Sequence, residues 1–272
     1  MKPAVFDYVR ADTLQEAVDL LADSGPDARI MAGGQSLMTA LNMRLAQPSV
    51  LIDISRVGDL DYVRTGKGYL AVGAAATQAS VEWRTSLVDE VPLLKQVFPH
   101  ISHFQVRNRG TVCGSIAHAD PSAELPLALL ALDGKVVLRN RRKQRVVGAE
   151  DFFQGMLMTA RAPDELVEEV RFPLVASGYR YGFNEFAARH GDFAIVSVAV
   201  VVHAQGMRLV VGGVSDRPRL KTLPLLRGAD LDTALNDFAW ELQAQDDHHA
   251  SAQFRRQLVR GLGRALIDKV TA

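Results

Sequence analysis

The first fifty-odd residues show apolar positions with helix and strand periods in turn. LQEAVDLLAD at 14–23 repeats apolar residues every three to four positions, which predicts a helix. Thr13 and Glu16 form a capping-box pattern at its start, and Gly25 closes it. Strands are predicted at 28–32 and 50–54, on either side of a helix at 37–46 that ends before Pro48. The residues GGQS would form the loop between the first strand and this helix.

The pattern changes after Gly58. YLAVGAAAT at 69–77 predicts a strand, Thr77 is placed to cap a helix at 78–87, and PLLKQVFPHISH at 92–103 predicts a second helix. KVVLRN and QRVVGA predict a hairpin around a basic turn, RNRRKQR at 139–145, and DELVEEVRFPL at 164–174 predicts a further strand. This part of the chain therefore mixes strands with short helices.

A boundary is predicted between Pro173 and Gly178. Beyond it, strands at 193–204 and 207–214 can pair around Gln205-Gly206, and helices follow at 232–243 and 251–270. The resulting fold class is α+β. We expect three parts: an N-terminal α/β lobe at 1–56, a second α+β lobe at 57–173 and a C-terminal α+β domain at 178–272.

Composition limits the class of protein. Lys+Arg and Asp+Glu both number 31 in 272 residues, so a dedicated nucleic-acid binder, with its usual basic excess, is not expected. The apolar runs are too short for a transmembrane segment, and the N-terminus lacks an apolar signal core, which favours a cytoplasmic location. The single Cys113 cannot form an internal disulfide or a four-cysteine iron–sulfur site.

Two stretches rich in small residues precede helices. GGQS at 33–36 would direct free backbone N–H groups at an anion. In NRGTVCGSIAHADPSAELP at 108–126, Asp120 can cap the next helix with Pro121 at its first position. Two donor-rich loops suit a dinucleotide pyrophosphate, although GGQS alone would be read as a tight turn. Neither loop matches the GxxxxGK[ST] or GxGxxG pattern.

A resemblance extends this interpretation. AGGQSL at 32–37 and VRNRGTVCGSIAHADPSAELP at 106–126 resemble the FAD-binding medium subunit of the molybdenum hydroxylases, which include carbon monoxide dehydrogenase and the xanthine dehydrogenase family. The likeness continues through 151–173 and 188–200. It implies a two-lobed FAD-binding domain of the PCMH type, followed by a C-terminal antiparallel sheet with helices.

The resemblance also implies roles for individual residues. Backbone amides of the first loop would wrap the FAD pyrophosphate: Ala32, Gly33, Gly34, Gln35, Ser36 and Leu37. The second stretch would hold the other side of FAD through Thr111, Gly114 and Ser115, with Ala117 near the flavin ring and Asp120 fixing the loop. Further contacts would come from Glu124, at the adenosine or ribose, from Leu166, and from Phe193 over one face of the ring.

Some residues depart from the family pattern or allow other readings. Cys113 stands where glycine is common, and Glu185 stands near a position where some relatives carry a lysine. His118 could bond covalently to the flavin, but a loop histidine is the preferred reading. His100 and His103 lie three apart on a predicted helix, yet no further metal ligands accompany them, so no metal site is expected. Asp246–His249 is expected to form a solvated loop.

The resemblance implies an electron-transfer role inside a larger enzyme. A small iron–sulfur subunit would carry two [2Fe–2S] clusters, a large subunit would carry the molybdenum cofactor, and the FAD of this chain would pass electrons to an external acceptor. A dimer of heterotrimers is expected. Two alternatives stay open at this point: a self-contained flavin oxidase or reductase of the same fold, and a non-catalytic nucleotide-binding scaffold. The substrate would be chosen by another chain.

Overall fold

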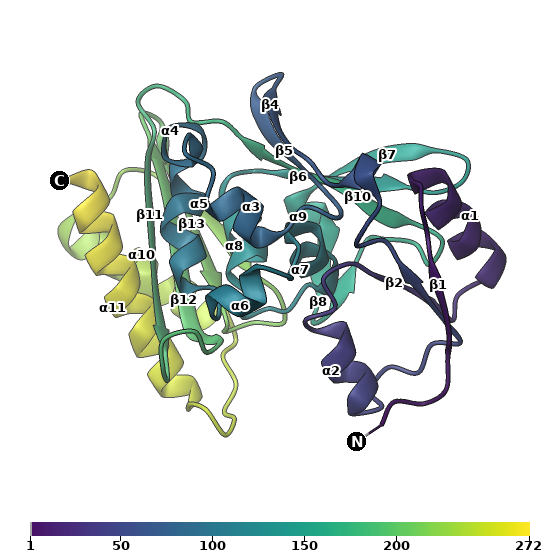
Figure 1. The fold of residues 1–272 in the computed structure, drawn as a ribbon. Helices are drawn as coiled ribbons and strands as arrows, with labels where there is room; N and C mark the ends of the chain where they lie inside the picture. The colour runs from purple at the N-terminus through teal and green to yellow at the C-terminus, as the bar shows by residue number, and fades with distance from the viewer. Residues whose placement is uncertain (1) are drawn as a thin grey trace.

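A computed structural model describes residues 2–272, and its N-terminal lobe is a small parallel sheet (Figure 1). The sheet has the order β1-β3-β2, with both pairings parallel. Its elements are β1 (Asp7–Arg10), α1 (Leu14–Ser24), β2 (Ala28–Met31), α2 (Leu37–Asn42) and β3 (Val50–Asp53). The predicted cap of α1 is present, since the Thr13 hydroxyl accepts a hydrogen bond from the Glu16 amide at 3.1 Å.

Helix α2 is shorter than the sequence predicted, and Pro48 does not end it. The helix stops at Asn42, and Arg44 adopts a left-handed φ of 59°. The amide of Leu45 then donates to the Ala40 carbonyl at 2.9 Å, and the amide of Arg44 to the Leu41 carbonyl at 3.0 Å. This closure satisfies carbonyls at the end of the helix four residues before the proline.

The second lobe is built on a five-stranded antiparallel sheet with the order β4-β5-β10-β6-β7. The strands are β4 (Val63–Gly66), β5 (Tyr69–Gly73), β6 (Lys135–Arg139), β7 (Gln144–Gly148) and β10 (Leu166–Pro173), and β8 (Phe153–Gly155) pairs separately with β9 (Met158–Thr159). Helices of this lobe are η1 (Gly58–Leu60), α3 (Gln78–Glu82), α4 (Leu87–Glu90), α5 (Pro92–Val97), η2 (Phe98–His100), α6 (Phe104–Arg107), α7 (Val112–His118), α8 (Glu124–Ala131) and α9 (Ala149–Phe152).

Three predicted helices of this lobe are wrong in their extent. The helix expected at 78–87 ends at Glu82, and a separate helix, α4, begins at Leu87. The helix expected at 92–103 ends at Val97 and continues only as a 3-10 turn, η2, because Pro99 has no N–H to donate. His100 and His103 therefore do not share one helix face. Helix α8 begins at Glu124 rather than after an Asp120 cap: the Asp120 carboxylate instead accepts from the Ser122 amide at 2.8 Å, in a turn that precedes the helix.

The C-terminal part is a four-stranded antiparallel sheet with helices on both faces. Its strands follow the chain order β11 (Arg180–Ala187), β12 (Ala194–His203), β13 (Gly206–Gly212) and β14 (Arg219–Leu223), and the predicted β12–β13 hairpin is confirmed. The helices α10 (Gly228–Glu241) and α11 (Ala252–Thr271) pack on each other, and α11 covers β11 and β12. From the second lobe, α8 packs on β12 and β13, and α5 packs on β11.

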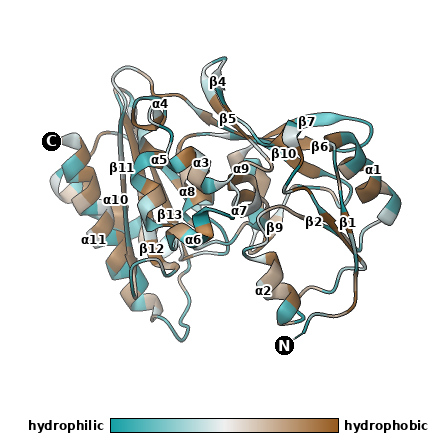
Figure 2. Cartoon of the chain, viewed as in Figure 1, coloured by the Kyte–Doolittle hydropathy of each residue, from teal (hydrophilic) through white to brown (hydrophobic). Residues whose placement is uncertain are grey.

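The described part of the chain has two buried apolar clusters. The larger runs through the first two lobes and reaches the C-terminal sheet at Phe183, Ala199, Val201 and Val210. The smaller joins the other face of that sheet to α10 and α11. Figure 2 shows hydrophobic residues along the strands and central helices, whereas the β6–β7 turn is hydrophilic. Within residues 2–272, no helix has the length and apolar character needed to cross a bilayer.

Candidate cofactor site

The first glycine loop joins β2 to α2 and leaves its backbone donors free. Gly34 has a φ of +70°, a left-handed conformation that side chains rarely adopt. Its carbonyl accepts from the Met38 amide at 3.0 Å, which fixes the turn into α2. Within residues 2–272, none of the amides of residues 33–37 donates a hydrogen bond to a protein acceptor. A run of unpaired N–H groups on a partly exposed loop is a suitable cradle for a phosphate.

The two glycine loops lie directly against each other. A Cβ on Gly33 would collide with the Arg109 carbonyl and would lie 2.8 Å from the Cα of Gly110. A Cβ on Gly110 would lie 3.5 Å from Cγ of Gln35. Stretches separated by more than seventy residues in sequence therefore meet backbone to backbone. This close approach gives the physical reason for glycine at position 33.

The second stretch is a helix start rather than an open loop. Thr111 is the N-cap of α7, and its hydroxyl accepts from the Gly114 amide at 2.9 Å. A Cβ on Gly114 would lie 2.6 Å from the Thr111 hydroxyl oxygen, so a side chain there would disturb the cap. Cys113 is buried in α7, where its thiol donates to the Val72 carbonyl at 3.3 Å and burial raises its pKa. Its backbone φ is not positive, so cysteine fits where glycine is common.

A buried ion pair supports this second stretch. The Arg107 guanidinium donates to both carboxylate oxygens of Glu82, at 2.7 and 3.0 Å, and to the Ile101 carbonyl at 2.7 Å. Both side chains are about nine-tenths buried. The pair therefore ties α3 and residue 101 to the turn that carries Arg109 and Gly110.

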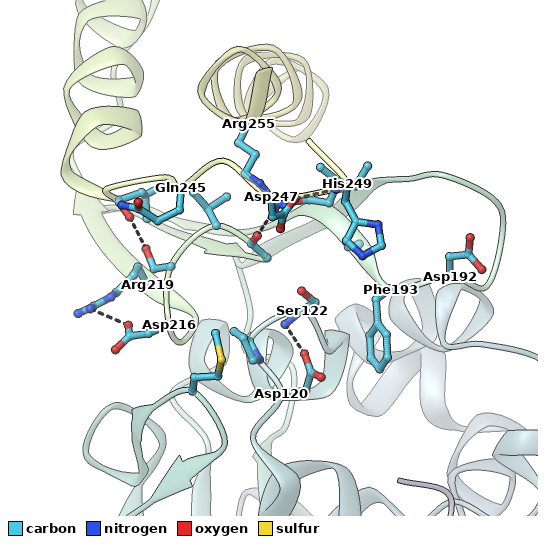
Figure 3. A pocket seen from close by; sticks show the side chains of 18 of the residues that line it. Asp120, Ser122, Asp192, Phe193, Asp216, Arg219, Gln245, Asp247, His249 and Arg255 are labelled. Atoms are coloured by element: carbon cyan, nitrogen blue, oxygen red, sulfur yellow. Dashed lines mark hydrogen bonds and ion pairs between the residues drawn. The ribbon is translucent and has the colours of Figure 1, made fainter. Parts of the chain in front are cut away.

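A cavity of about 900 Å³ lies between the second lobe and the C-terminal domain (Figure 3). Asp120 and Ser122 line one side of the cavity, and Asp247 and Arg255 line the opposite side. Asp247 and Arg255 form an ion pair with each other at 2.6 Å. Phe193, on the loop between β11 and β12, borders the same space and is 61% exposed. An exposed aromatic ring at the edge of a cavity is placed to cover a planar ligand.

Comparison with known proteins identifies the family of the chain. Residues 4–175 match the model of the FAD binding domain in molybdopterin dehydrogenase. The chain belongs to this FAD-binding family. It is therefore an FAD-binding oxidoreductase subunit of the molybdenum-hydroxylase type, and FAD is its cofactor.

Full-length similarity supports the family assignment. The chain is 37% identical to the 6-hydroxypseudooxynicotine dehydrogenase complex subunit alpha of Paenarthrobacter nicotinovorans, over 96% of this chain and 92% of that protein. It is 36% identical to the nicotine 6-hydroxylase medium subunit of the same organism, over 100% and 99%. Its fold matches a chain of carbon monoxide dehydrogenase from Hydrogenophaga pseudoflava with a TM-score of 0.93, at 27% identity, covering 99% of this chain and 98% of that chain.

The expected FAD-contact residues occupy different surroundings. Ala32, Gly33, Gly34 and Leu37 are partly buried in the first loop, and Gln35 and Ser36 are exposed. Gly114, Ser115 and Ala117 are partly buried along α7, whereas Thr111 is buried and its hydroxyl caps its own helix. Leu166 begins β10 with its side chain in the core, so only its main chain could face a ligand. The individual FAD contacts stay predictions.

Glu124 is buried, whereas a residue that contacts a nucleotide at the surface would be exposed. It is 4% exposed at the first position of α8, and burial raises its pKa to about 8. The charge of Glu185 on β11 adds to this rise, and that of His100 opposes it. Glu185 and His100 are bonded to each other at 3.1 Å. The sequence analysis named Glu185 and His100 separately. Only the fold brings these two side chains together near Glu124.

The structure also bears on two further expectations, the absence of a metal site and the solvated loop at 246–249. Among residues 2–272, no three or more His, Cys, Asp and Glu side chains are grouped so that they could hold a metal ion. Asp246–His249 is exposed, as expected for a solvated loop, but Asp247 also accepts from the amides of His249 and Ala250 and lines the cavity. No local pattern predicted this second side of the cavity, because its residues are scattered over the C-terminal domain.

Proposed function

We propose that this chain carries FAD as the electron-transfer subunit of a heterotrimeric molybdenum hydroxylase. Electrons arrive from the [2Fe–2S] clusters of a small partner subunit and leave from FAD to an external acceptor. A large partner subunit carries the molybdenum cofactor and oxidises the substrate. The observation that supports this most is the set of free amides at 33–37, held against the second glycine stretch in a chain of the FAD-binding family.

The first loop is the proposed pyrophosphate site. The pyrophosphate of FAD carries negative charge, and several unpaired N–H groups on one loop can bind it without a cationic side chain. Gly33 keeps the loop close to Arg109 and Gly110, so residues beyond Thr111 border the same ligand. Gly114, Ser115 and Ala117 then lie along α7, where small side chains leave space for the cofactor.

The flavin ring is proposed to lie near Ala117, Asp120 and Phe193. Asp120 is held by its bond from the Ser122 amide, and Phe193 borders the cavity that Asp120 also lines. FAD supplies the redox chemistry when bound, and the residues of this chain position it and exclude water from one face. No side chain of this chain has to remove a proton from an organic substrate in this account.

The names of similar proteins support the proposal that this chain is one subunit of a larger enzyme. One is named as a subunit of a dehydrogenase complex, and another as the medium subunit of a hydroxylase. This chain covers more than nine-tenths of the length of both. A dimer of heterotrimers and a cytoplasmic location stay predictions.

The test compares the chain alone with the assembled complex. The purified chain should release FAD, not FMN, on denaturation. Its FAD should be reduced by an artificial electron donor and reoxidised by a dye. A heterocyclic or aldehyde substrate should reduce the FAD only after an iron–sulfur subunit and a molybdenum subunit are added. Reduction of FAD by such a substrate in the single chain would instead support the self-contained flavin enzyme, and colour retained on the denatured protein would indicate a covalent link, with His118 tested first.

A further inference from the structure

An ionisable cluster, with Glu185 buried and His100 partly exposed, lies between the second lobe and the C-terminal sheet. His100, at the end of η2, bonds through Nδ1 to Glu185 on β11 at 3.1 Å. The Glu185 side chain is only 5% exposed, and its second oxygen, Oε2, has no hydrogen-bond partner. A buried carboxylate with a single partner is costly unless that partner carries a positive charge. Glu185 therefore favours the protonated form of His100.

The groups that face this pair are few. Glu124, on α8, is one of them, since its charge raises the pKa of His100. Asp120, in the turn before α8, acts on Glu124, whose pKa its charge raises. Phe183 packs its ring edge against His100, with centroids 5.0 Å apart, and His190 lies 6.3 Å from His100 by ring centroids. The hydrogen bond that the protonated His100 ring donates to Glu185 raises the pKa of His100 above its usual range. Burial raises the pKa of Glu124 to about 8, so Glu124 is mostly neutral near pH 7.

The cluster lies beside the loop that is proposed to border the flavin ring. His190 belongs to the segment 188–193, which ends in Phe193. In the same segment, a Cβ on Gly191 would lie 2.9 Å from Cε1 of His103 and 3.0 Å from the Ser102 carbonyl, so the loop rests on residues 102–103. His100 precedes Ser102 by two residues and therefore lies close to this loop.

We propose that His100, held by Glu185, binds a proton that accompanies reduction of the FAD. This inference rests on the proposed function. Two electrons from the iron–sulfur partner and one proton from solvent would give the reduced, anionic flavin. Above the raised pKa of His100 in the oxidised protein, where its ring is neutral, a second solvent proton would convert this ring to its cation. The added positive charge offsets the charge gained by the flavin. Glu185 is a positioning residue in this scheme, since it acts on the flavin only through His100.

The experiment measures the FAD midpoint potential against pH in the FAD-loaded protein. In the wild type, the potential should fall more steeply with pH than in His100→Gln, by one extra proton per two electrons, over a window that begins at the raised pKa of His100. Glu185→Gln removes the charge that stabilises the His100 cation and should move this window to lower pH. His203→Gln, at the β12–β13 turn where His203 bonds to Gln205 at 2.9 Å, is the matched control and should follow the wild type.

The outcomes separate this inference from the proposed function. Wild-type protein without FAD would contradict the proposed function. FAD that is present and reducible, but with the same pH dependence in wild type and His100→Gln, would overturn the role of His100 alone. If His100→Gln does not fold, Glu185→Gln decides: an unmoved window overturns the inference, and a window moved to lower pH supports it. NMR titration of the imidazole in wild type and Glu185→Gln gives a readout independent of activity, and equal pKa values for His100 would also overturn it.

Discussion

The two glycine-rich stretches look alike in sequence but differ in their backbone hydrogen bonds in the structure. The first, at 33–37, has a left-handed glycine and amides without protein acceptors. The second, at 111–115, returns two of its amides to its own helix: that of Gly114 donates to the Thr111 hydroxyl at 2.9 Å, and that of Ser115 to the Thr111 carbonyl at 3.2 Å. Within residues 2–272, all five amides of the first stretch lack a protein acceptor, whereas the second stretch pairs the amides of Gly114 and Ser115.

The difference shows that small residues serve either ligand contact or backbone packing. In the first stretch, the conformation leaves N–H groups free for a phosphate. In the second, small side chains let α7 pack beside β5 and β10 and let the turn at 109–110 touch Gly33. We therefore expect changes in the first stretch to alter FAD retention chiefly, and changes in the second to alter stability first.

Gly33→Val should have the largest effect on FAD. The added side chain collides with the Arg109 carbonyl and must push the two stretches apart. Bound FAD per protein after gel filtration should fall at least tenfold, which corresponds to about 1.4 kcal/mol or more in binding free energy. Gly261→Ala, with open space at a helix surface, is the matched control and should keep its FAD. Full FAD content in Gly33→Val would mean that contact between the stretches is not needed for binding.

Arg107→Leu should have the largest effect on stability. It leaves the Glu82 carboxylate buried without its bidentate partner, and loss of one member of a buried pair costs about 3–5 kcal/mol. Chemical denaturation of the FAD-free protein measures the change. Arg141→Ala removes a solvent-exposed pair with Asp19 and should leave the unfolding midpoint nearly unchanged. Equal midpoints for both variants would show that the Glu82–Arg107 pair does not hold the second stretch.

Thr111→Ala should cost less, about 1 kcal/mol, because it removes the cap of α7. Thr111→Ser keeps a capping hydroxyl and should stay close to the wild type. Unfolding midpoints of the two variants provide the measurement. FAD content should fall only modestly in Thr111→Ala; a loss as large as that in Gly33→Val would assign the Thr111 hydroxyl to the cofactor rather than to the helix.

Glu124→Gln should change the slope of stability against pH. Burial raises the pKa of Glu124 from 4.5 to about 8 in the folded protein. The folded state then holds a proton that the unfolded state has lost between these values, so the free energy of unfolding of the FAD-free protein should fall as pH rises from about 4.5 to about 8. His100, whose pKa is also raised, adds a contribution of the same sign. Glu124→Gln should flatten this fall, and an unchanged slope would mean that Glu124 is ionised in the folded protein.

Local signals in the sequence were enough for much of the fold. The capping pair Thr13 and Glu16, the β6–β7 hairpin and the β12–β13 hairpin follow from short-range rules and are present. Helix ends were harder to predict, because Arg44 closes α2 through a left-handed turn and the Asp120 turn delays α8 to Glu124. Such endings depend on backbone conformation that residue type only weakly specifies.

The candidate site was predictable only where its residues are contiguous. The family motifs located both glycine stretches, but not the contact of Gly33 with Arg109 and Gly110, which requires the fold. The pairing of His100 with Glu185 spans 85 positions and joins the second lobe to the C-terminal sheet. No periodicity or local spacing relates residues so far apart, so these parts of the site emerged only in three dimensions.

A structure of the FAD-loaded protein tests the central claim most directly. The account predicts that pyrophosphate oxygens accept hydrogen bonds from amides within residues 33–37, while Phe193 lies over the flavin ring. It also predicts that the Thr111–Gly114 cap persists beside the cofactor. A pyrophosphate bound elsewhere, with the amides of 33–37 still facing solvent, would contradict the assignment of the first glycine loop as the FAD cradle.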